Sequence, residues 1–557
     1  MRQKNLKTMA AALLVAVIFL APLSAVHNET TNTGTPSDIM AAANTGQPAI
    51  EWEKTFGGDE YDYFRDIQQT SDGGYLALGE TEQDDMNYAW LLKLDADGTE
   101  EWSTVNQDVN GSTYNSEDLA NMVIETSDGS FVACGFSSVY YSDYSLWSGA
   151  GYLWKVDASG QTDWLKRYQG ISEPEGILSI FPFNIIEADD GYVMGGLSVV
   201  ITDPDTGAYI LDGALMKTDE NGDLEWYQTY DGGNDYEALT SLCATDDGGY
   251  FLSGMSTTLT FSAGAVWALK TDSEGNKQWE QKFDGPALDF SQARGCGQCE
   301  DGGYIIGGTT GSYGAGRLDV WVIKTDASGN MEWDKTFGGT ENDQCWGMQI
   351  LPDGGYVFGA VYNLGGFGGT QDDTWIIKTD ADGNAEWKYQ IEESGPQIPA
   401  IITQTADDGY IAAGRTGNSD TKSTDAFIVK VGSFDNDRPD KPATPSGPAS
   451  GTTGEEHTYS SSVTDPDGDQ VYFQWDWGDG NYSEWLGPYN SGETCEATHT
   501  WTVDGTYSIT VVTKDEHDGD SDTSDPLPVS MPKDYQPRWI TLLEYFWTLL
   551  TQFLTVA

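Results

Sequence analysis

The chain has 557 residues, with 27 basic against 89 acidic side chains and a net charge of −62. So acidic a surface repels phosphate backbones and anionic headgroups, which excludes nucleic acid and strongly anionic membranes as partners. The length is sufficient for more than one domain. Much of the acid lies in short Asp- and Gly-rich segments, so solvated turns are the preferred explanation of the charge.

The first residues predict export. Arg2, Lys4 and Lys7 precede the apolar run Met9–Leu23, which is the order of charged and apolar residues in a secretory signal peptide. We therefore expect a signal peptide over 1–26 and a small, polar linker over 27–47. The predicted location is extracellular or cell-surface associated.

A hairpin-like segment recurs along the next four hundred residues. Trp321–Trp333 has the sequence WVIKTDASGNMEW, in which an apolar run ends in Lys-x-Asp, a D-x-x-G turn follows and a second strand ends on Trp. Glycine supplies the positive φ that such a turn needs. The closing tryptophans, separated by 50, 62, 62, 53, 54 and 54 residues, are Trp52, Trp102, Trp164, Trp226, Trp279, Trp333 and Trp387. This period, with four strand-like runs per unit, is typical of a β-propeller.

A second motif, D-G-G-Y followed by an apolar run and Gly, indicates the number of units. Its seven copies are Ser71–Gly79, Ser127–Gly135, Asp189–Gly196, Asp246–Gly254, Glu300–Gly308, Pro352–Ala360 and Asp407–Gly414. The seventh unit ends at Asp425–Gly432 without a following Trp strand, whereas Ala49–Gly58 is an orphan copy of that strand. We therefore predict an all-β fold, with a seven-bladed β-propeller over 48–434. The N-terminal strand closes the predicted ring, because closure removes exposed sheet edges.

The long connections of the predicted propeller share one face and carry aromatic residues. Aromatic rings with polar edges suit the apolar faces of sugars or a protein partner, and function tends to lie on such loops. For each ring, packing against the end of a blade is the alternative interpretation. The candidate ligand-binding residues are Tyr61, Tyr63, Tyr114, Tyr141, Trp147, Tyr236, Tyr313, Trp346 and Tyr362.

The six cysteines do not form a disulfide framework. Cys134, Cys243 and Cys345 fall in strand-like runs and are expected to be buried apolar residues. Cys296 and Cys299 form a lone C-x-x-C, whereas a zinc site needs a second pair of ligands. No metal is therefore predicted at these cysteines.

A second domain is predicted over 455–532, after a Pro/Gly/Ser-rich linker at 435–454. Trp475–Gly480 (WDWGDG) and Gly505–Val511 (GTYSITV) resemble the polycystic-kidney-disease (PKD) domain. The resemblance implies an immunoglobulin-like β-sandwich of extracellular proteins, some of which bind calcium through acidic residues. Asp465, Asp467 and Asp469 offer hard oxygen ligands at alternate positions of a Gly-containing loop, as calcium prefers. A turn without an ion is the equally weighted alternative, and no organic cofactor is predicted.

The last segment predicts an apolar to amphipathic helix over 535–557. As a helix, the nineteen residues Trp539–Ala557 would extend about 28 Å, enough for a bilayer core. Lys533 and Arg538 precede this run and nothing basic follows it, which opposes the positive-inside tendency for an exported protein. A shallow or partner-bound helix therefore competes with a spanning anchor, and attachment to a membrane or envelope is expected by either route.

No catalytic residues are predicted. The hairpins are similar to those of pyrroloquinoline-quinone enzymes and to the Asp-box hairpins of sialidases, but the adjacent Cys pair of many quinoprotein sites is missing. The arginines of the repeat region are scattered along the chain, at Arg65, Arg167, Arg294, Arg317 and Arg415. No histidine lies between His27 and His457, which leaves no Ser/His/Asp set. Enzymatic activity is left open, and a non-catalytic role is favoured.

The domain combination resembles archaeal and bacterial cell-surface proteins that join propellers to PKD domains. This resemblance implies an extracellular binding or adhesion protein, in which the loop face binds a glycan or protein and the PKD domain is a spacer. One alternative is a secreted polysaccharide lyase or glycosidase with an accessory PKD domain. A second alternative is a structural envelope protein.

Overall fold

The structure is a computed structural model that describes 50–532 and Trp547. Short segments are excepted, at 59, 84–85, 107–114, 142–145, 169–170, 174–175, 204–207, 235, 259–263, 285–290, 316, 341, 364–371, 392–396, 417–423, 434–436 and 517–518. The predicted signal peptide, the linker at 27–47 and, apart from Trp547, the C-terminal helix lie outside the described residues. The chain divides into two compact units, the first ending at 435 and the second beginning at 436 and including the short segment 384–387. Among the described residues, no helix is long and apolar enough to cross a bilayer.

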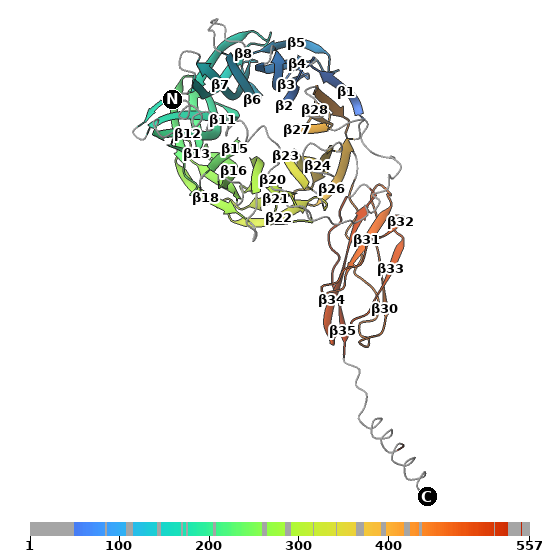
Figure 1. The fold of residues 1–557 in the computed structure, drawn as a ribbon. Coiled ribbons are helices and arrows are strands. Elements are labelled where there is room, and N and C mark those ends of the chain that lie inside the picture. The colour runs from blue at the N-terminus through green and yellow to red at the C-terminus, as the bar shows by residue number, and fades with distance from the viewer. Residues whose placement is uncertain are drawn as a thin grey trace. The chain divides into compact units, whose positions relative to one another are not determined.

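The first unit consists of seven antiparallel sheets in its described part, and in Figure 1 they follow one another around a common centre. The first sheet contains β2 (Asp62–Gln69), β3 (Tyr75–Gln83), β4 (Met86–Leu94) and β5 (Glu100–Val105). The second contains β6 (Asn115–Glu125), β7 (Phe131–Tyr141), β8 (Leu146–Val156) and β9 (Thr162–Tyr168). The third contains β10 (Ile171–Glu173), β11 (Gly176–Ala188), β12 (Gly191–Asp203), β13 (Ala208–Asp219) and β14 (Leu224–Tyr230).

The remaining sheets of this unit have four strands each. The fourth contains β15 (Tyr236–Ala244), β16 (Tyr250–Thr257), β17 (Gly264–Thr271) and β18 (Lys277–Phe283). The fifth contains β19 (Ser291–Gln298), β20 (Tyr304–Thr310), β21 (Asp319–Thr325) and β22 (Met331–Phe337). The sixth contains β23 (Asn342–Ile350), β24 (Tyr356–Asn363), β25 (Asp372–Thr379) and β26 (Ala385–Ile391). The seventh contains β27 (Gln397–Gln404), β28 (Tyr410–Thr416), β29 (Ala426–Val431) and, from the other end of the chain, β1 (Ile50–Phe56).

The orphan repeat at the beginning of the chain completes the last sheet. β1 pairs antiparallel with β29, with Phe56 opposite Ala426 and Lys54 opposite Ile428. This pairing is the one predicted from the missing Trp strand of the seventh unit. The all-β repeat is therefore confirmed, and the seven sheets fit a propeller-like array.

Six of the seven closing tryptophans pack against the turn of the next sheet. A Cβ added to Gly98 of the first sheet would lie 2.9 Å from the Trp52 ring of the seventh, and Gly98 has a φ of 71°. The same contact joins the consecutive sheets from the first to the sixth, in the pairs Gly160–Trp102, Gly222–Trp164, Gly275–Trp226, Gly329–Trp279 and Gly383–Trp333. The turn glycine is therefore required twice, for its positive φ and for the neighbouring indole ring.

In every sheet of this unit, a buried or half-buried lysine on the strand that precedes the D-x-x-G turn, or on β29 in the seventh sheet, pairs with the aspartate of the D-G-G turn. Lys270 of β17 is 3% exposed and lies 2.9 Å from Asp247, and its ammonium also donates to the Thr271 carbonyl at 2.7 Å. The equivalent pairs are Lys93–Asp72, Lys155–Asp128, Lys217–Asp190, Lys324–Asp301, Lys378–Asp353 and Lys430–Asp407. The aspartates of the D-G-G turns thus form a repeated ion pair with these lysines, and they also contact solvent.

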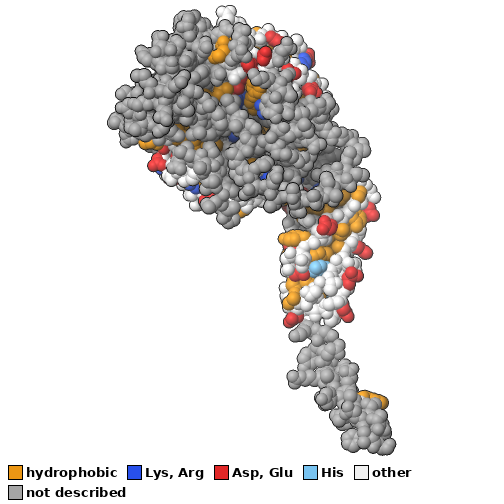
Figure 2. Space-filling model, viewed as in Figure 1, with side chains coloured by type: hydrophobic (Ala, Val, Ile, Leu, Met, Phe, Trp, Pro, Cys, Tyr) orange, Lys and Arg blue, Asp and Glu red, His pale blue; other side chains and the backbone are white. Residues whose placement is uncertain are grey.

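The second unit is a small sandwich of two sheets. One sheet pairs β30 (His457–Ser462) with β33 (Thr494–His499). The other has the order β32 (Leu486–Tyr489), β31 (Val471–Asp476), β34 (Gly505–Asp515) and β35 (Leu527–Met531). Its core includes the buried rings of Phe473, Trp475 and Trp501. Acidic side chains are distributed over the face of this unit that is visible in Figure 2.

All six cysteines are free thiols. Cys134 and Cys345 are buried, as expected, whereas Cys243 is half-buried. Cys296 lies on β19, the first strand of the fifth sheet. The expectation of no disulfide framework is confirmed.

Candidate binding cavity in the sheet array

The first long strand of each sheet carries one extra residue opposite its neighbour. In β2, Phe64 is paired with Gly79 and Asp66 with Leu78, so Arg65 has no partner in the ladder. The same irregularity lies at the equivalent place in the other six sheets, where the extra residues are Asn121, Phe183, Thr240, Arg294, Trp346 and Ala400. These are β-bulges, which bend a strand and redirect a side chain.

The final glycine of the D-G-G-Y motif explains where each bulge forms. A Cβ on Gly79 would lie 1.9 Å from the Tyr63 carbonyl oxygen, and one on Gly254 would lie 1.9 Å from that of Ala238. In these sheets the strands approach too closely there for a side chain, as glycine in a strand interior often indicates. The sixth sheet differs, because it has Ala360 at this position, opposite Cys345. The recurring glycine is the sequence signal from which the bulges could have been predicted.

The bulges surround one cavity of about 210 Å³, to which all seven sheets contribute. Six of the seven bulge residues line it, and they come from β2, β6, β11, β15, β19 and β23. Ile401 of β27 represents the seventh sheet, and Tyr63, Asp66 and Asn184 add further polar groups. The wall therefore combines two guanidinium groups, amides, a hydroxyl and aromatic rings.

The two arginines of the cavity differ in their partners. Arg65 Nε donates to Glu80 Oε1 at 2.6 Å, and the carboxylate of Glu80 is fully buried. Burial opposes the charge of Arg65, but Glu80 offsets that effect and raises its pKa. Arg294 has no such partner within the described residues, and burial lowers its pKa. Two of the arginines that are scattered along the sequence thus line the same cavity.

Asp66 is the acidic group of the cavity wall. Its carboxyl is 1% exposed. Burial raises its pKa to about 7, although hydrogen bonds from the backbone of Val123 and Ile67 act in the opposite direction. The Asp66 Oδ2 atom accepts from the Val123 amide at 2.8 Å, whereas its buried Oδ1 atom has no hydrogen bond. Near neutral pH this side chain can therefore exist as either donor or acceptor.

The structure places the predicted aromatic residues in different environments. Tyr63 and Trp346 line the cavity, whereas Tyr61 does not, and its hydroxyl oxygen accepts a hydrogen bond from Arg415 at 2.9 Å. Tyr236 is fully buried, so the expectation that it belongs to the exposed loop face is corrected. Tyr313 is 38% exposed and does not line the cavity. Tyr114 and the side chains of Tyr141, Trp147 and Tyr362 lie outside the described residues.

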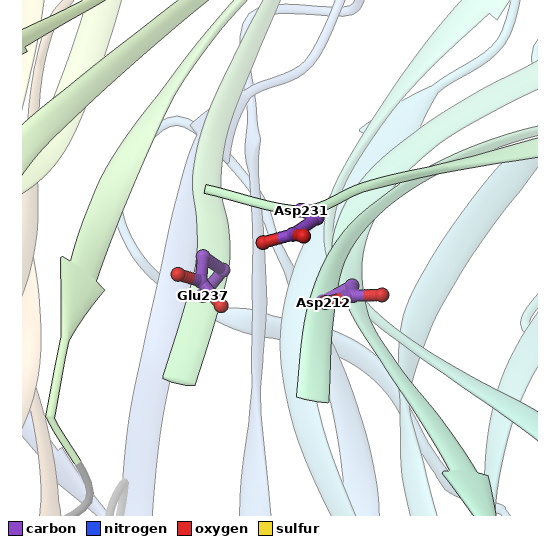
Figure 3. Close-up of side chains that lie close together, drawn as sticks. All are labelled: Asp212, Asp231 and Glu237. Atoms are coloured by element: carbon purple, nitrogen blue, oxygen red, sulfur yellow. The ribbon is translucent and has the colours of Figure 1, made fainter. Parts of the chain in front are cut away.

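Three carboxylates gather where the third and fourth sheets meet. Asp212 of β13, Asp231 and Glu237 of β15 offer oxygens within 4.8 Å of one another (Figure 3). Glu237 is fully buried; its Oε1 accepts from the Asn234 amide at 2.7 Å, while Oε2 has no hydrogen bond. Burial, and then the charge of Asp212, raise the pKa of Glu237.

Part of this acidic cluster is an arrangement that other sheets repeat. A carboxylate near the start of the first long strand accepts a hydrogen bond from a backbone amide of the preceding loop, and we call this arrangement the loop clamp. Asp62 and Asp343, at the equivalent strand starts, accept from the amides of Gly58 and Gly339 at 2.8 and 2.7 Å. In the fourth sheet, Lys282 also donates to the Gly232 carbonyl and to Ser256, which in turn donates to Glu237. The Asn234 amide and the Ser256 hydroxyl thus hold Oε1 of Glu237.

The predicted calcium ligands of the second unit lie together. Asp465, Asp467 and Asp469 offer oxygens within 4.8 Å of one another. Asp465 is 5% exposed; its Oδ1 accepts from the amides of Asp467 and Asp469 at 3.0 and 3.1 Å, and its buried Oδ2 has no hydrogen bond. Burial raises the pKa of Asp465, and the neighbouring Asp469 acts in the same direction. These residues fit a cation, because an incoming ion would satisfy the unpaired oxygen.

Comparison with solved structures gives weak likenesses for the first unit. The core factor of S. cerevisiae is 8% identical over 69% of this chain and 62% of its own, with a TM-score of 0.34. A glycoside hydrolase family 32 protein from Bifidobacterium adolescentis is 8% identical over 71% and 80%, with a TM-score of 0.30. Such low values carry no argument about activity. No curated protein matches the chain.

The second unit is recognised by sequence. A PKD domain from an M14-like peptidase of a Thermoplasmatales archaeon is 40% identical over 18% of this chain and all of its own, with a TM-score of 0.17. The family model of the PKD domain matches residues 437–529. This match includes the WDWGDG and GTYSITV strings and both sheets of the sandwich. Residues 437–529 of the chain therefore belong to the PKD domain family.

Proposed function

We propose that this chain is an extracellular, surface-retained binding protein that holds a glycan at the cavity of its sheet array. The observation that carries the proposal is the single cavity to which seven sheets contribute bulged side chains. Bulges are often found beside functional sites, where they redirect a side chain. Trp346 and Tyr63 supply aromatic surface, while Asn121, Thr240 and the arginines supply hydrogen bonds, a combination that suits sugars.

We further propose that the array is a closed, seven-bladed β-propeller. The contacts between the seventh and first sheets support this, because they repeat those between consecutive sheets. Gln69 accepts from the Ala406 amide at 2.7 Å, just as Glu125 of the second sheet accepts from the Ser71 amide of the first at 2.6 Å. The Trp52–Gly98 contact is a second example. A closed ring would hold the cavity wall rigid.

The PKD domain supports the extracellular part of the proposal, since such domains occur mainly in extracellular or surface proteins. In this reading it is a spacer between the array and the envelope. We propose that its Asp465 loop holds calcium, supported by the unpaired, buried Oδ2 atom. Attachment through the C-terminal segment remains a prediction.

A glycan array probed with the full chain tests the proposed binding function. We expect W346A to weaken binding at least tenfold, because a ring in a binding cavity is a typical energetic anchor. W485A is the matched control, since Trp485 is a 37% exposed ring of the second unit. Binding without turnover is expected. No binding to any glycan would contradict the proposal, and product release would favour the polysaccharide-active alternative.

A further inference from the structure

Arg294 is a half-buried cation that has no acidic partner within the described residues. Its guanidinium makes no hydrogen bond or ion pair there, and its Nε atom is buried without an acceptor. The neighbouring group is the Trp346 ring, whose centroid is 5.1 Å from the guanidinium carbon. Burying a charge without a partner is costly, so such a group is kept where a ligand supplies the partner.

Two further donors of the same cavity also lack acceptors. Trp346 Nε1 and Asn184 Nδ2 are buried and make no hydrogen bond. The Oδ1 atom of Asn184 is already used by the Gly195 amide at 3.2 Å. The cavity wall therefore presents three unsatisfied donor groups against one unsatisfied acceptor, the Oδ1 atom of Asp66. An excess of donors beside a free guanidinium favours an anionic occupant.

Of the described residues, only one arginine of the cavity wall is free to pair with an anionic group. Glu80 already neutralises Arg65, and Arg415, whose guanidinium is 5.5 Å from the Tyr63 ring, donates to the hydroxyl oxygen of Tyr61. Arg294 is thus the one guanidinium lining the cavity, within the described residues, that is free to make an ion pair. A guanidinium fork matches the two oxygens of a planar carboxylate.

The size of the cavity limits the occupant. Its volume of about 210 Å³ is below the roughly 300–1,000 Å³ of pockets for drug-sized ligands. One sugar ring or its acidic substituent fits this scale, whereas a longer segment of chain does not. The aromatic wall at Tyr63 and Trp346 suits the apolar face of such a ring.

Resting on the proposed glycan-binding function, we propose that the cavity selects an acidic sugar, a uronate, whose carboxylate binds Arg294. Arg294 would hold the carboxylate through its guanidinium, and Trp346 would contribute its ring and its Nε1–H. A neutral sugar would leave the guanidinium buried and unpaired. Neutral sugars should therefore bind less tightly than the matching uronates.

Calorimetric titration of the full chain with three matched ligands tests this inference: methyl glucuronide, its carboxyl methyl ester and methyl glucoside. We expect methyl glucuronide to bind at least tenfold more tightly than either neutral ligand. R294Q should remove that difference, whereas R167Q, which removes one positive charge from the outer strand β9, should preserve it. Thermal unfolding of each variant verifies that it folds. The comparison of ligands on the unaltered chain holds even if R294Q does not fold.

The outcomes separate this inference from the function on which it rests. Equal binding of the charged and neutral ligands, unaffected by R294Q, would overturn the carboxylate inference and leave glycan binding standing. Binding of a sulfated glucoside in place of the uronate would also overturn it. Failure of every saccharide, charged or neutral, would overturn both proposals.

Discussion

At the scale of single residues, burial rather than residue type distinguishes the groups of interest. The chain has 89 acidic side chains, and most of those in turns carry ordinary local roles. Asp66 and Asp465 belong to a smaller group, with Glu237, in which one carboxylate oxygen is buried without a hydrogen bond. Arg294 differs from Arg65 because no carboxylate among the described residues is paired with it. No sequence pattern reports a missing partner, so these groups could not be singled out before the structure.

Asp66 should make stability depend on pH. Its pKa is raised from 3.8 to about 7, so its stabilising contribution is fully present below pH 3.8 and is lost as the pH rises through about 7. D66N cannot titrate. Between pH 5.5 and 8, the unaltered chain should lose about 2 kcal/mol of its free energy of unfolding relative to D66N. Urea unfolding at the two pH values measures this, and parallel changes in both proteins would contradict it.

Calcium should stabilise the second unit through Asp465. A ligand that binds the folded state raises its stability according to its concentration and affinity. We expect millimolar calcium to raise the unfolding temperature of the PKD transition by several degrees, and a chelator to reverse the change. D465N should abolish the response, whereas E237Q, in the acidic clamp of the first unit, should preserve it. If calorimetry gives the same unfolding temperature for the PKD transition with and without chelator, calcium binding at Asp465 is contradicted.

At the scale of elements, each repeat is stabilised by an ion pair between residues of its two motifs, and the motifs do not show this pairing by themselves. The Lys-x-Asp and D-G-G motifs predict a strand end and a turn, and both agree with the local structure. The motifs alone do not predict that the lysine of one pairs with the aspartate of the other, as Lys270 does with Asp247. The pairing joins residues of non-adjacent turns, so local propensity carries no sign of it. The presence of both residues in all seven units was the available signal.

The Lys270–Asp247 pair should contribute measurably to the fourth sheet. The hydrogen bond from Thr245, and then that from Lys270, lower the pKa of Asp247 to about 2. Its contribution is therefore present above pH 3.8 and lost as the pH falls towards 2. At pH 7, D247N should destabilise the chain by about 1–2 kcal/mol, since Asp247 is half exposed and its charge is screened. Adding K270M should recover part of this loss.

Denaturant unfolding of the two single variants and the double variant measures the coupling between Lys270 and Asp247. D97N is the control, because Asp97 is an exposed turn residue of the first sheet. Additive effects of D247N and K270M would contradict a stabilising pair.

At the scale of the whole molecule, much of the architecture could be predicted and the cavity could not. The Trp spacing, the D-x-x-G turns and the orphan strand are regular enough to indicate seven repeated sheets and the pairing of β1 with β29. The cavity depends on bulges that add one residue to a strand, and alternation in a sequence does not locate such an insertion. The second domain was recognised because WDWGDG is distinctive. Arg65 and Arg294 meet only because strands of different sheets converge.

Removal of β1 should damage the array as a whole. Without β1 the edge of β29 is exposed and the Trp52–Gly98 contact is lost, so both stability and solubility should fall. We expect a chain beginning at residue 59 to unfold roughly 5–10 °C lower and to self-associate with rising concentration. A chain beginning at residue 47 retains β1 and is the control. Thermal unfolding and analytical ultracentrifugation measure both effects, and identical behaviour of the two chains would contradict the role given to β1.

The bulges have one more consequence, which concerns how such a protein can change over time. A bulge residue stands outside the hydrogen-bonded ladder, so replacing its side chain leaves the pairing of its strand intact. Arg65, Asn121, Phe183, Thr240, Arg294 and Trp346 already differ in charge, size and polarity at equivalent places. Relatives with the same scaffold can therefore acquire new preferences by exchanging a handful of side chains, while the small residue of the neighbouring strand, Gly or Ala, is kept.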